Sequence, residues 1–433
     1  MFLALLKTRR FAPLFWCQFL SAFNDNFVRN ILAMLLLFRL GGAQSGTLIT
    51  LAIGVFVLPS IVLSSLGGEI ADANDKARVI RALKAAEILV QAIAAVGFWF
   101  FSLALLYTAL FGLGVVSALF SPIKSGILPD QLKRDELVAG NALIEAATFL
   151  AILFGLIAGA LAAKSTVPQL KVVCQMMGIA FACFATSWLI PPTKVAAPDL
   201  RIEPNVFAST GALIKDLSRT PFLQQSGFAL SWFWLTGAVA LSLVPVAVRN
   251  ATGGGIEVEA AISALFAIGV GAGSLGAALV TRGRILLTPA PLAALGMAFF
   301  LVDIGLATWA LVPAPSGATS LSTFFSSAAG LRIAADVAGL AAAGGFYVVP
   351  LFAAVQAEAP PEKRARIMAA INIWNSIFMV AGTIVTALLQ SKLVGISEPK
   401  LLIGLGLANL GAALYVQREI MPHKARLAQH DPV

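Results

Sequence analysis

The sequence predicts an all-α membrane protein in which twelve transmembrane helices form two halves of six. Three observations support this fold class. Of the 433 residues, 59% are hydrophobic and only 12% are charged, whereas charged residues make up about 25% of a soluble globular chain. Apolar windows of span length, about 20 residues, recur along the chain. The order of motifs in the first six windows also recurs in the last six.

Each apolar window is bounded by charged residues, Pro or Gly. The windows are 12–38, 47–66, 79–101, 103–127, 137–163, 170–190, 222–247, 258–281, 286–311, 332–355, 367–390 and 397–417. The long polar interval between the sixth and seventh windows divides them evenly. It sets the expected domains as a first half (1–190), a linker (191–220), a second half (221–418) and a tail (419–433). A Ser/Ala/Gly-rich, uncharged interval from Pro313 to Gly330 predicts a flexible external loop.

Basic residues indicate the orientation of the chain. About twenty Lys and Arg lie on one side of the predicted spans, among them Lys84 after the second window, and about seven lie on the other. Both termini and the linker are therefore expected in the cytoplasm. The net charge of +9 lies in short loops and so reports topology; it does not indicate nucleic-acid binding. The first window has no small-residue cleavage site, which favours a retained span over a signal peptide.

The first window carries polar residues near mid-depth, where a charged residue costs about 2.5 to 3.5 kcal/mol on insertion scales. These residues are Asn24, Asp25, Asn26 and Arg29. Asp25 and Arg29 are four residues apart, on one helix face, and can partly neutralise each other. They form either a structural pair or part of a substrate or ion path. We favour the path because charge inside a membrane usually marks function.

The fourth and fifth windows carry further polar candidates. Lys124 follows Pro122, which kinks a helix, and such a break is tolerated where it lines a cavity. The lysine either snorkels to the interface, pairs with Asp25, or binds a phosphate as a point charge. Asn141 and Glu145 are four residues apart and share a face, so Glu145 is either a titrating carboxylate or an interhelical hydrogen-bond partner. Glu87, near a span end, is expected to be solvated.

The two halves repeat one order of motifs. Ser121-Pro122-Ile-Lys124 in the fourth window corresponds to Val349-Pro350-Leu-Phe352 in the tenth. In each half a basic loop and an amide-bearing helix follow, with Asn141 in the first half and Asn372 and Asn375 in the second. Two halves repeated in parallel predict a substrate site near mid-membrane between them.

The repeat places aromatic residues of the second half opposite polar residues of the first. Trp232 and Trp234 align with Ala22 and Asn24, and Phe352 aligns with Lys124. Singly, such rings more often pack in a core or face lipid. Together they suggest a cavity that is polar on one wall and apolar on the other, suited to a solute with a charged head and a hydrocarbon tail. The candidate substrate-contacting residues are Asn24, Asp25, Arg29, Lys124, Asn141, Glu145, Trp232, Trp234, Phe352, Asn372 and Asn375.

Signs of an enzyme are nearly absent. Both histidines, His423 and His430, fall in the tail, so no histidine is expected in the membrane for a metal site, a triad or a proton relay. The stretch Gly271-Ala-Gly273-Ser-Leu-Gly276 matches a dinucleotide-binding pattern by letter, but it lies in an apolar window without a preceding strand. Small residues at this spacing predict close helix packing instead. We expect no enzyme activity, no cofactor and no metal site.

The loop after the second window resembles the signature of the major facilitator superfamily. It reads Gly67-Gly68-Glu-Ile-Ala-Asp72-Ala-Asn-Asp75-Lys76-Ala-Arg78. In that family the glycine allows close helix approach, and the acid meets a helix end and a basic residue, which latches one conformation. The resemblance implies latch roles for Gly68, Asp72 and Arg78, although Ala73 replaces the usual basic residue. A solvated turn is the alternative.

Four stretches resemble the lysophospholipid transporter family (LplT-type) of that superfamily. They are Gln18-Phe-Leu-Ser-Ala-Phe-Asn-Asp25-Asn, Ser121-Pro-Ile-Lys124-Ser-Gly-Ile-Leu-Pro129, Leu137-Val-Ala-Gly-Asn141-Ala-Leu-Ile-Glu145-Ala-Ala-Thr and Gly344-Gly-Phe-Tyr-Val-Val-Pro350-Leu-Phe-Ala-Ala-Val-Gln356. The resemblance implies a bacterial inner-membrane flippase that works by alternating access. It would move lysophospholipids, chiefly lysophosphatidylethanolamine, inward for reacylation.

The resemblance also implies contacts and partners. The substrate phosphate would meet Lys124 or Arg29, an ammonium head group would meet Asp25 or Glu145, and membrane lipids would surround a monomer. Some relatives carry an arginine in the seventh span, which residues 238–242 lack. No acyltransferase domain follows Val433, so we expect any acyltransferase/acyl carrier protein synthetase to be a separate chain or part of a longer protein.

Two other functions remain open. A proton-coupled exporter of amphipathic drug-like cations would use Asp25 or Glu145 as its titrating group and would tolerate loss of Lys124. A membrane scaffold or receptor would show no substrate-dependent change, and the charges inside the spans disfavour it.

Overall fold

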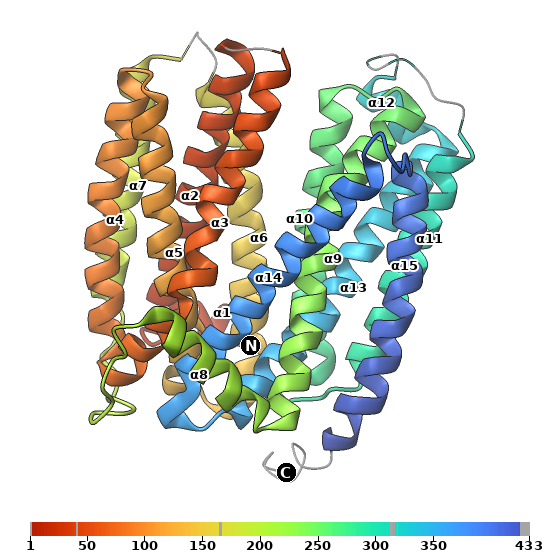
Figure 1. The fold of residues 1–433 in the computed structure, drawn as a ribbon. Coiled ribbons are helices and arrows are strands. Elements are labelled where there is room, and N and C mark those ends of the chain that lie inside the picture. The colour runs from red at the N-terminus through yellow and green to blue at the C-terminus, as the bar shows by residue number, and fades with distance from the viewer. Residues whose placement is uncertain are drawn as a thin grey trace. The chain divides into compact units, whose positions relative to one another are not determined.

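The protein is an all-helical chain, shown in Figure 1 as a computed structural model. The structure describes residues 2–39, 42–163, 167–311, 315, 317 and 319–424. Within these residues the regular structure is helical, and the only β-structure is one isolated bridge between Gly254 and Thr319. The predicted all-α class is therefore confirmed.

Among the described residues up to 220 there are six long helices, two short ones and a 3₁₀ turn. They are α1 (Phe2–Leu5), α2 (Ala12–Arg39), α3 (Gly42–Ala73), α4 (Lys76–Trp99), α5 (Leu103–Gln131), the 3₁₀ turn Arg134–Glu136, α6 (Leu137–Ala162), α7 (Gln169–Trp188) and α8 (Val206–Ser218). The predicted linker 191–220 therefore contains a helix, α8.

The described residues from 221 to 424 form six long helices and one short one. They are α9 (Pro221–Thr252), α10 (Ile256–Thr281), α11 (Pro289–Trp309), α12 (Leu321–Ser326), α13 (Ala328–Glu358), α14 (Arg364–Gln390) and α15 (Glu398–Tyr415). A 3₁₀ turn (Pro361–Lys363) precedes α14, and a π-helical turn (Val416–Ile420) and a 3₁₀ turn (Met421–His423) follow α15. The expected flexible loop 313–330 is partly wrong, because α12 and the start of α13 lie in it; Pro313 itself lies outside the described residues, as does the tail from 425 onward.

Twelve helices of the described chain have 18 residues or more, one for each predicted window. Ten of them are long and apolar enough to cross a membrane. The two that fall short, α2 and α4, carry the charged residues described below. Side-chain caps start several helices, as where Asp75 accepts a hydrogen bond from the Ala77 N–H (3.0 Å) at the start of α4.

The helices form two compact units. Unit 1 comprises residues 1–133, 150–220 and 356–373, and unit 2 comprises residues 134–149, 221–355 and 374–433. In unit 1, a hydrophobic cluster joins α2, α4, α5 and α7 and includes Phe27, Ile31, Phe98, Leu110 and Met176. In unit 2, α11 packs along α15, and the two helices can be followed side by side in Figure 1.

Small residues allow the closest helix contacts in unit 2, as the glycine-rich stretch of α10 predicted. A Cβ atom added to Gly273 would lie 2.1 Å from the backbone oxygen of Ala342 in α13. A Cβ on Gly345 of α13 would lie 2.3 Å from the backbone nitrogen of Ser274. Since atoms cannot approach so closely, α10 and α13 depend on glycine at both positions. The packing interpretation of this stretch is confirmed.

Candidate functional site

The polar stretch of α2 lies inside unit 1 and is held by local contacts. Asn26 donates to the backbone oxygen of Ala22 (2.7 Å) and accepts a hydrogen bond from Arg29 through its Oδ1. The Arg29 guanidinium also lies 5.7 Å from the centre of the Phe56 ring, a cation–π contact. Arg29 remains within electrostatic range of Asp25, but its hydrogen bond goes to the amide. The hydrogen bond of Arg29 is therefore made to Asn26, whereas the spacing had suggested Asp25 as its partner.

A buried ion pair on α4 is the feature that the sequence interpretation missed. The Lys84 Nζ donates to Glu87 Oε2 (2.6 Å) and to the Ser21 Oγ of α2 (2.7 Å), and it lies 4.0 Å from the centre of the Phe120 ring. The side chains of Lys84 and Glu87 are 0% and 1% exposed. The expectations of a loop lysine and a solvated Glu87 are therefore wrong.

The position of this pair follows from where α4 begins. Because the helix starts at Lys76, Lys84 lies about 12 Å along it at 1.5 Å per residue. Lys84, Glu87 and Gln91 are spaced by three and four residues, so they share one face of the helix. This spacing, inside the predicted window 79–101, is the signal from which the site could have been found.

Lys124 lies within a helix that continues well beyond it. The fourth predicted window ends at residue 127, whereas α5 continues to Gln131 and contains Pro122 and Pro129. The lysine is half-buried and lies within electrostatic range of Asp25. On the same helix, Ser121 Oγ accepts a hydrogen bond from Asn372 of α14 (2.9 Å). Asp25, Arg29, Lys124 and Asn372 therefore all belong to unit 1.

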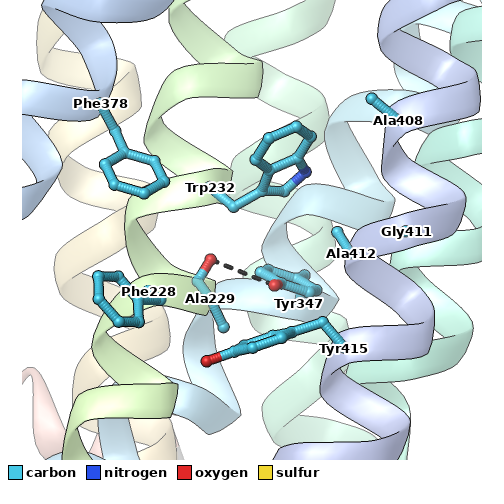
Figure 2. Close-up of a pocket in the computed structure, with 9 residues that line it drawn as sticks. All are labelled: Phe228, Ala229, Trp232, Tyr347, Phe378, Ala408, Gly411, Ala412 and Tyr415. Carbon is cyan, nitrogen blue, oxygen red and sulfur yellow. Dashed lines mark hydrogen bonds between the residues drawn. The ribbon is translucent and has the colours of Figure 1, made fainter.

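Unit 2 contains an apolar cavity of about 380 Å³ between α9, α13, α14 and α15. Figure 2 shows Trp232 and Phe228 of α9 and Tyr415 of α15 on its walls, with Tyr347 of α13 behind them. The other lining residues are Ala229, Phe378, Ala408, Gly411 and Ala412. A volume above about 300 Å³ is typical of small-molecule sites, which are mostly apolar.

The polar atoms of Tyr347, Trp232 and Tyr415 all have hydrogen-bond partners within the protein. The Tyr347 hydroxyl donates to the backbone oxygen of Ala229 (3.2 Å), the dashed line in Figure 2. The Trp232 Nε1 donates to Asn409 Oδ1 (3.1 Å) and the Tyr415 hydroxyl to the backbone oxygen of Gln225 (3.4 Å). The space that remains is bounded by ring faces and small side chains, so it favours hydrocarbon.

Among the candidates predicted in unit 2, Trp232 alone lines this cavity. Trp234 stacks on Phe149 of α6, with ring centres 6.4 Å apart and ring planes 12° apart. Phe352 is buried, and Asn375 Oδ1 accepts a hydrogen bond from Ser231 Oγ (2.9 Å).

The remaining two candidates of unit 2 lie on α6. Asn141 and Glu145 are buried one turn apart, and the Asn141 Nδ2 donates to the backbone oxygen of Leu137 (2.9 Å). The residues that sequence reasoning missed are instead Tyr347, Phe228 and Tyr415, whose aromatic character carried no periodic signal.

A contact between the two sequence halves lies wholly inside unit 1. Both carboxylate oxygens of Asp72, at the end of α3, accept backbone N–H bonds at the start of α14, from Ala365 and Arg366 (3.1 Å each). The Arg366 Nε adds a third bond at 3.1 Å. A Cβ on Gly68 would lie 2.9 Å from the Arg366 Cα, so glycine allows α3 and α14 to meet.

Further ion pairs surround this contact. The pairs in this region show that the basic partner of Asp72 is not the expected Arg78. Asp130 of α5 pairs with Lys76 (2.8 Å) and with Arg364 (3.1 Å). The expected latch residue Arg78 is 83% exposed and lies 3.7 Å from Asp75. The basic residue that binds Asp72 is therefore Arg366, which lies almost 300 positions away in the sequence.

We expect Lys84→Met to destabilise the protein strongly, because it leaves a buried carboxylate without its counter-ion. Breaking one partner of such a pair costs about 3 to 5 kcal/mol, while replacing both by apolar residues is often neutral. The double variant Lys84→Met/Glu87→Met should therefore recover most of the loss in thermal unfolding of purified protein. The control, Lys363→Met, breaks a partly exposed pair with Asp216 (2.8 Å), worth about 1 kcal/mol. Equal losses in the two single variants would contradict this interpretation.

Comparisons with known proteins agree with this architecture. The family model of the Major Facilitator Superfamily matches residues 14–415. Lysophospholipid transporter LplT of Serratia proteamaculans (strain 568) is 29% identical over 363 residues, 81% of each chain. The protein of the same name from Enterobacter sp. (strain 638) is 30% identical over 350 residues, 78% of each chain.

Solved structures share the fold at low identity. The human organic anion transporter MFSD10 superposes with a TM-score of 0.73 at 15% identity, covering 94% of this chain and 99% of that one. The E. coli fucose:proton symporter FucP superposes with a TM-score of 0.70 at 13% identity, covering 94% and 97%. The chain belongs to the major facilitator superfamily and, within it, to the LplT family.

Proposed function

We propose that this protein transports lysophospholipids across the bacterial inner membrane by alternating access. The observation that carries the proposal is its similarity, over about four-fifths of both chains, to proteins named lysophospholipid transporter. Two features of the described chain support it. Unit 1 holds buried and half-buried charge, and unit 2 holds an apolar cavity, so the chain offers both chemistries of a one-tailed phospholipid. Lysophosphatidylethanolamine remains the preferred substrate in this proposal.

The polar residues of unit 1 suit the head group. Lys124 and Arg29 offer positive charge for a phosphate, and Asp25 offers a carboxylate for an ammonium group. In unit 2, Glu145 offers a second carboxylate, and its neighbour Asn141 an amide. Of the remaining candidates, Asn24 and Asn372 add amide groups in unit 1, and Trp234, Phe352 and Asn375 add rings and an amide in unit 2.

The cavity of unit 2 suits the acyl chain. Each methylene that leaves water for an apolar site contributes about 0.8 kcal/mol. The rings of Phe228, Trp232 and Tyr347 are among its lining residues, and Gly411 and Ala412 add small ones. The cavity therefore binds by contact area, which is compatible with acyl chains that vary in length.

We further propose that Asp72 and Gly68 form a latch with the start of α14. The three bonds to Asp72 combine an ion pair with two N–H groups of a helix amino end, where a negative charge is favourable. Releasing them would accompany the change of access. Arg366 takes the role that the sequence suggested for Arg78.

The setting of the protein follows from the same proposal. Both termini face the cytoplasm, where basic residues concentrate. The protein acts as a monomer among membrane lipids and delivers its substrate to an acyltransferase/acyl carrier protein synthetase.

Asp25→Asn and Lys124→Ala should each abolish uptake of lysophosphatidylethanolamine into proteoliposomes. The reason is that a hydrogen bond to a charged group is worth about 1.5 to 3 kcal/mol, which is at least roughly tenfold in affinity. Size-exclusion chromatography checks that both variants stay folded. Full uptake by Lys124→Ala together with a strict need for a proton gradient would favour an exporter of amphipathic cations instead.

Gly411→Phe should impair transport of long-chain lysophospholipids, because its ring would occupy the cavity. Loss of contact with two methylenes, about 1.6 kcal/mol, raises the KM for a palmitoyl substrate roughly tenfold, with a smaller effect on an octanoyl substrate. Gly404→Phe is the matched control: it lies two turns earlier on α15, and at both glycines no atom lies within 4 Å of an added Cβ. If the two variants behave alike for both chain lengths, the cavity does not bind the acyl chain.

Asp72→Asn and Arg366→Gln should both slow transport without unfolding the protein. Losing one charge-assisted bond, about 1.5 to 3 kcal/mol, shifts the balance between conformations by roughly 10- to 100-fold. Arg78→Gln removes an exposed charge and should retain the normal uptake rate in the same proteoliposome assay. A defect in Arg78→Gln as large as that in Arg366→Gln would return the latch role to Arg78.

A further inference from the structure

α11 and α13 of unit 2 pack closely and run in opposite directions. A Cβ on Gly296 of α11 would lie 3.4 Å from the Ala343 Cβ of α13. One turn later on α11 and one turn earlier on α13, a Cβ on Gly339 would overlap the Phe300 ring. Facing positions therefore advance along α11 as they go back along α13, by three or four residues at each step.

The next facing pair in this register is Asp303 of α11 and Asp336 of α13. Their carboxyl groups lie within hydrogen-bonding reach of each other. Arg332, one turn before Asp336 on α13, donates to Asp303 through its Nε (3.1 Å) and its Nη2. Asp336 is 6% exposed, and its buried Oδ2 receives no hydrogen bond from any described residue. The site thus buries a carboxylate that faces another carboxylate and lacks a donor.

These three residues do not balance in charge. When all three are ionised, Asp303, Asp336 and Arg332 carry one excess negative charge. The charged groups that act on the two aspartates are each other and Arg332. One bound cation, either a proton or a metal ion, would neutralise the excess.

The charged residues of the surrounding helices are engaged elsewhere. Arg249 of α9 pairs with Glu259 of α10 (2.9 Å). On α15, the Lys400 Nζ lies 5.6 Å from the centre of the Trp309 ring, and Glu398 accepts a hydrogen bond from a glutamine side chain (3.4 Å). The short helix α12 contains no charged residue. None of these groups supplies the missing charge at Asp336.

A proton fits the site better than a metal ion. Two carboxyl groups can form a hydrogen bond with each other only when one of them carries a proton. A hard cation takes about six oxygen ligands, whereas both oxygens of Asp303 already accept from Arg332. Nowhere in the described chain do three or more His, Cys, Asp or Glu side chains gather to hold a metal ion. A proton removes the excess charge and turns an unpartnered acceptor into a donor.

We propose that Asp336 is a proton-binding site of unit 2 and that Asp303 accepts the hydrogen bond of the bound proton. In the loading step a hydrated proton moves to the Asp336 carboxylate: one O–H bond forms, and a neutral water molecule leaves. The new O–H donates to Asp303, whose charge Arg332 continues to balance. The Arg332 side chain is 53% exposed and that of Asp303 20%, so the site is reached from outside the helix bundle.

This inference goes beyond the proposed function, since it concerns proton binding in the absence of any lipid substrate. The test is an infrared titration of the full chain in liposomes without lysophospholipid, following the carboxylic C=O band between about pH 4 and pH 9. The wild type should show a protonation step that Asp336→Asn lacks. Glu257→Gln, in the exposed first turn of α10, should keep that step.

Two further variants separate a proton site from a merely structural cluster. Arg332→Gln should move the step to higher pH, because it removes the cation that favours ionised carboxylates. Asp303→Asn should move it to lower pH, because it removes the neighbouring negative charge and frees Arg332 to bind Asp336. Each shift should be about 1 to 3 pH units.

Two results would overturn the proposal directly. One is an Asp336→Asn variant that retains the wild-type step. The other is displacement of the step by Na⁺ at constant pH, which would make the occupant a metal cation. If Asp336→Asn does not fold, the Arg332 and Asp303 variants decide, and shifts that are absent or in the same direction contradict the proposal. Since no lysophospholipid is present, the outcome is independent of the uptake assays above.

Discussion

The constraint on which unit 1 depends is that charge inside an apolar helix bundle needs partners within the bundle. Lys84 satisfies it with three: a carboxylate at 2.6 Å, a hydroxyl at 2.7 Å and an aromatic ring at 4.0 Å. Replacing a buried ion pair by packed apolar residues is often neutral or stabilising, so stability alone does not account for it. The cost of burying this ion pair is understandable if transport requires α2, α4 and α5 to hold ionisable groups at a fixed height within the helix bundle.

The two units divide the chemistry of an amphiphile. Unit 1 combines Lys84 and Glu87 with the polar stretch of α2, whereas the cavity of unit 2 is bounded by Phe228, Trp232 and Tyr347, whose polar atoms are bonded elsewhere. Hydrogen bonds and ion pairs depend on exact positions, while contact with hydrocarbon depends on area. A transporter built in this way can be selective for a head group and tolerant of chain length.

The contact proposed as a latch shows how a short motif engages backbone as well as side chains. Asp72 accepts two N–H groups at the start of α14 and one from Arg366. The first N–H groups of a helix have no partner within that helix, so the aspartate satisfies donors that are present in every sequence at that position. Gly68 permits the approach. The glycine and the acid were therefore identifiable from the motif, whereas a basic partner near the motif in sequence was the wrong choice.

The sequence by itself determined the fold class, the twelve long helices and the close packing at Gly273, because hydropathy and small-residue spacing are local properties of a chain. It also named Asp25 and Lys124, since charge within an apolar window stands out. Only the tertiary structure decided which groups meet. Lys84 was counted with the basic residues of the cytoplasmic side until the structure placed it, buried, beside Glu87, and Arg366 replaced Arg78 across almost 300 residues. The cavity joins residues of four helices, and contacts between distant segments leave no periodic trace in any one of them.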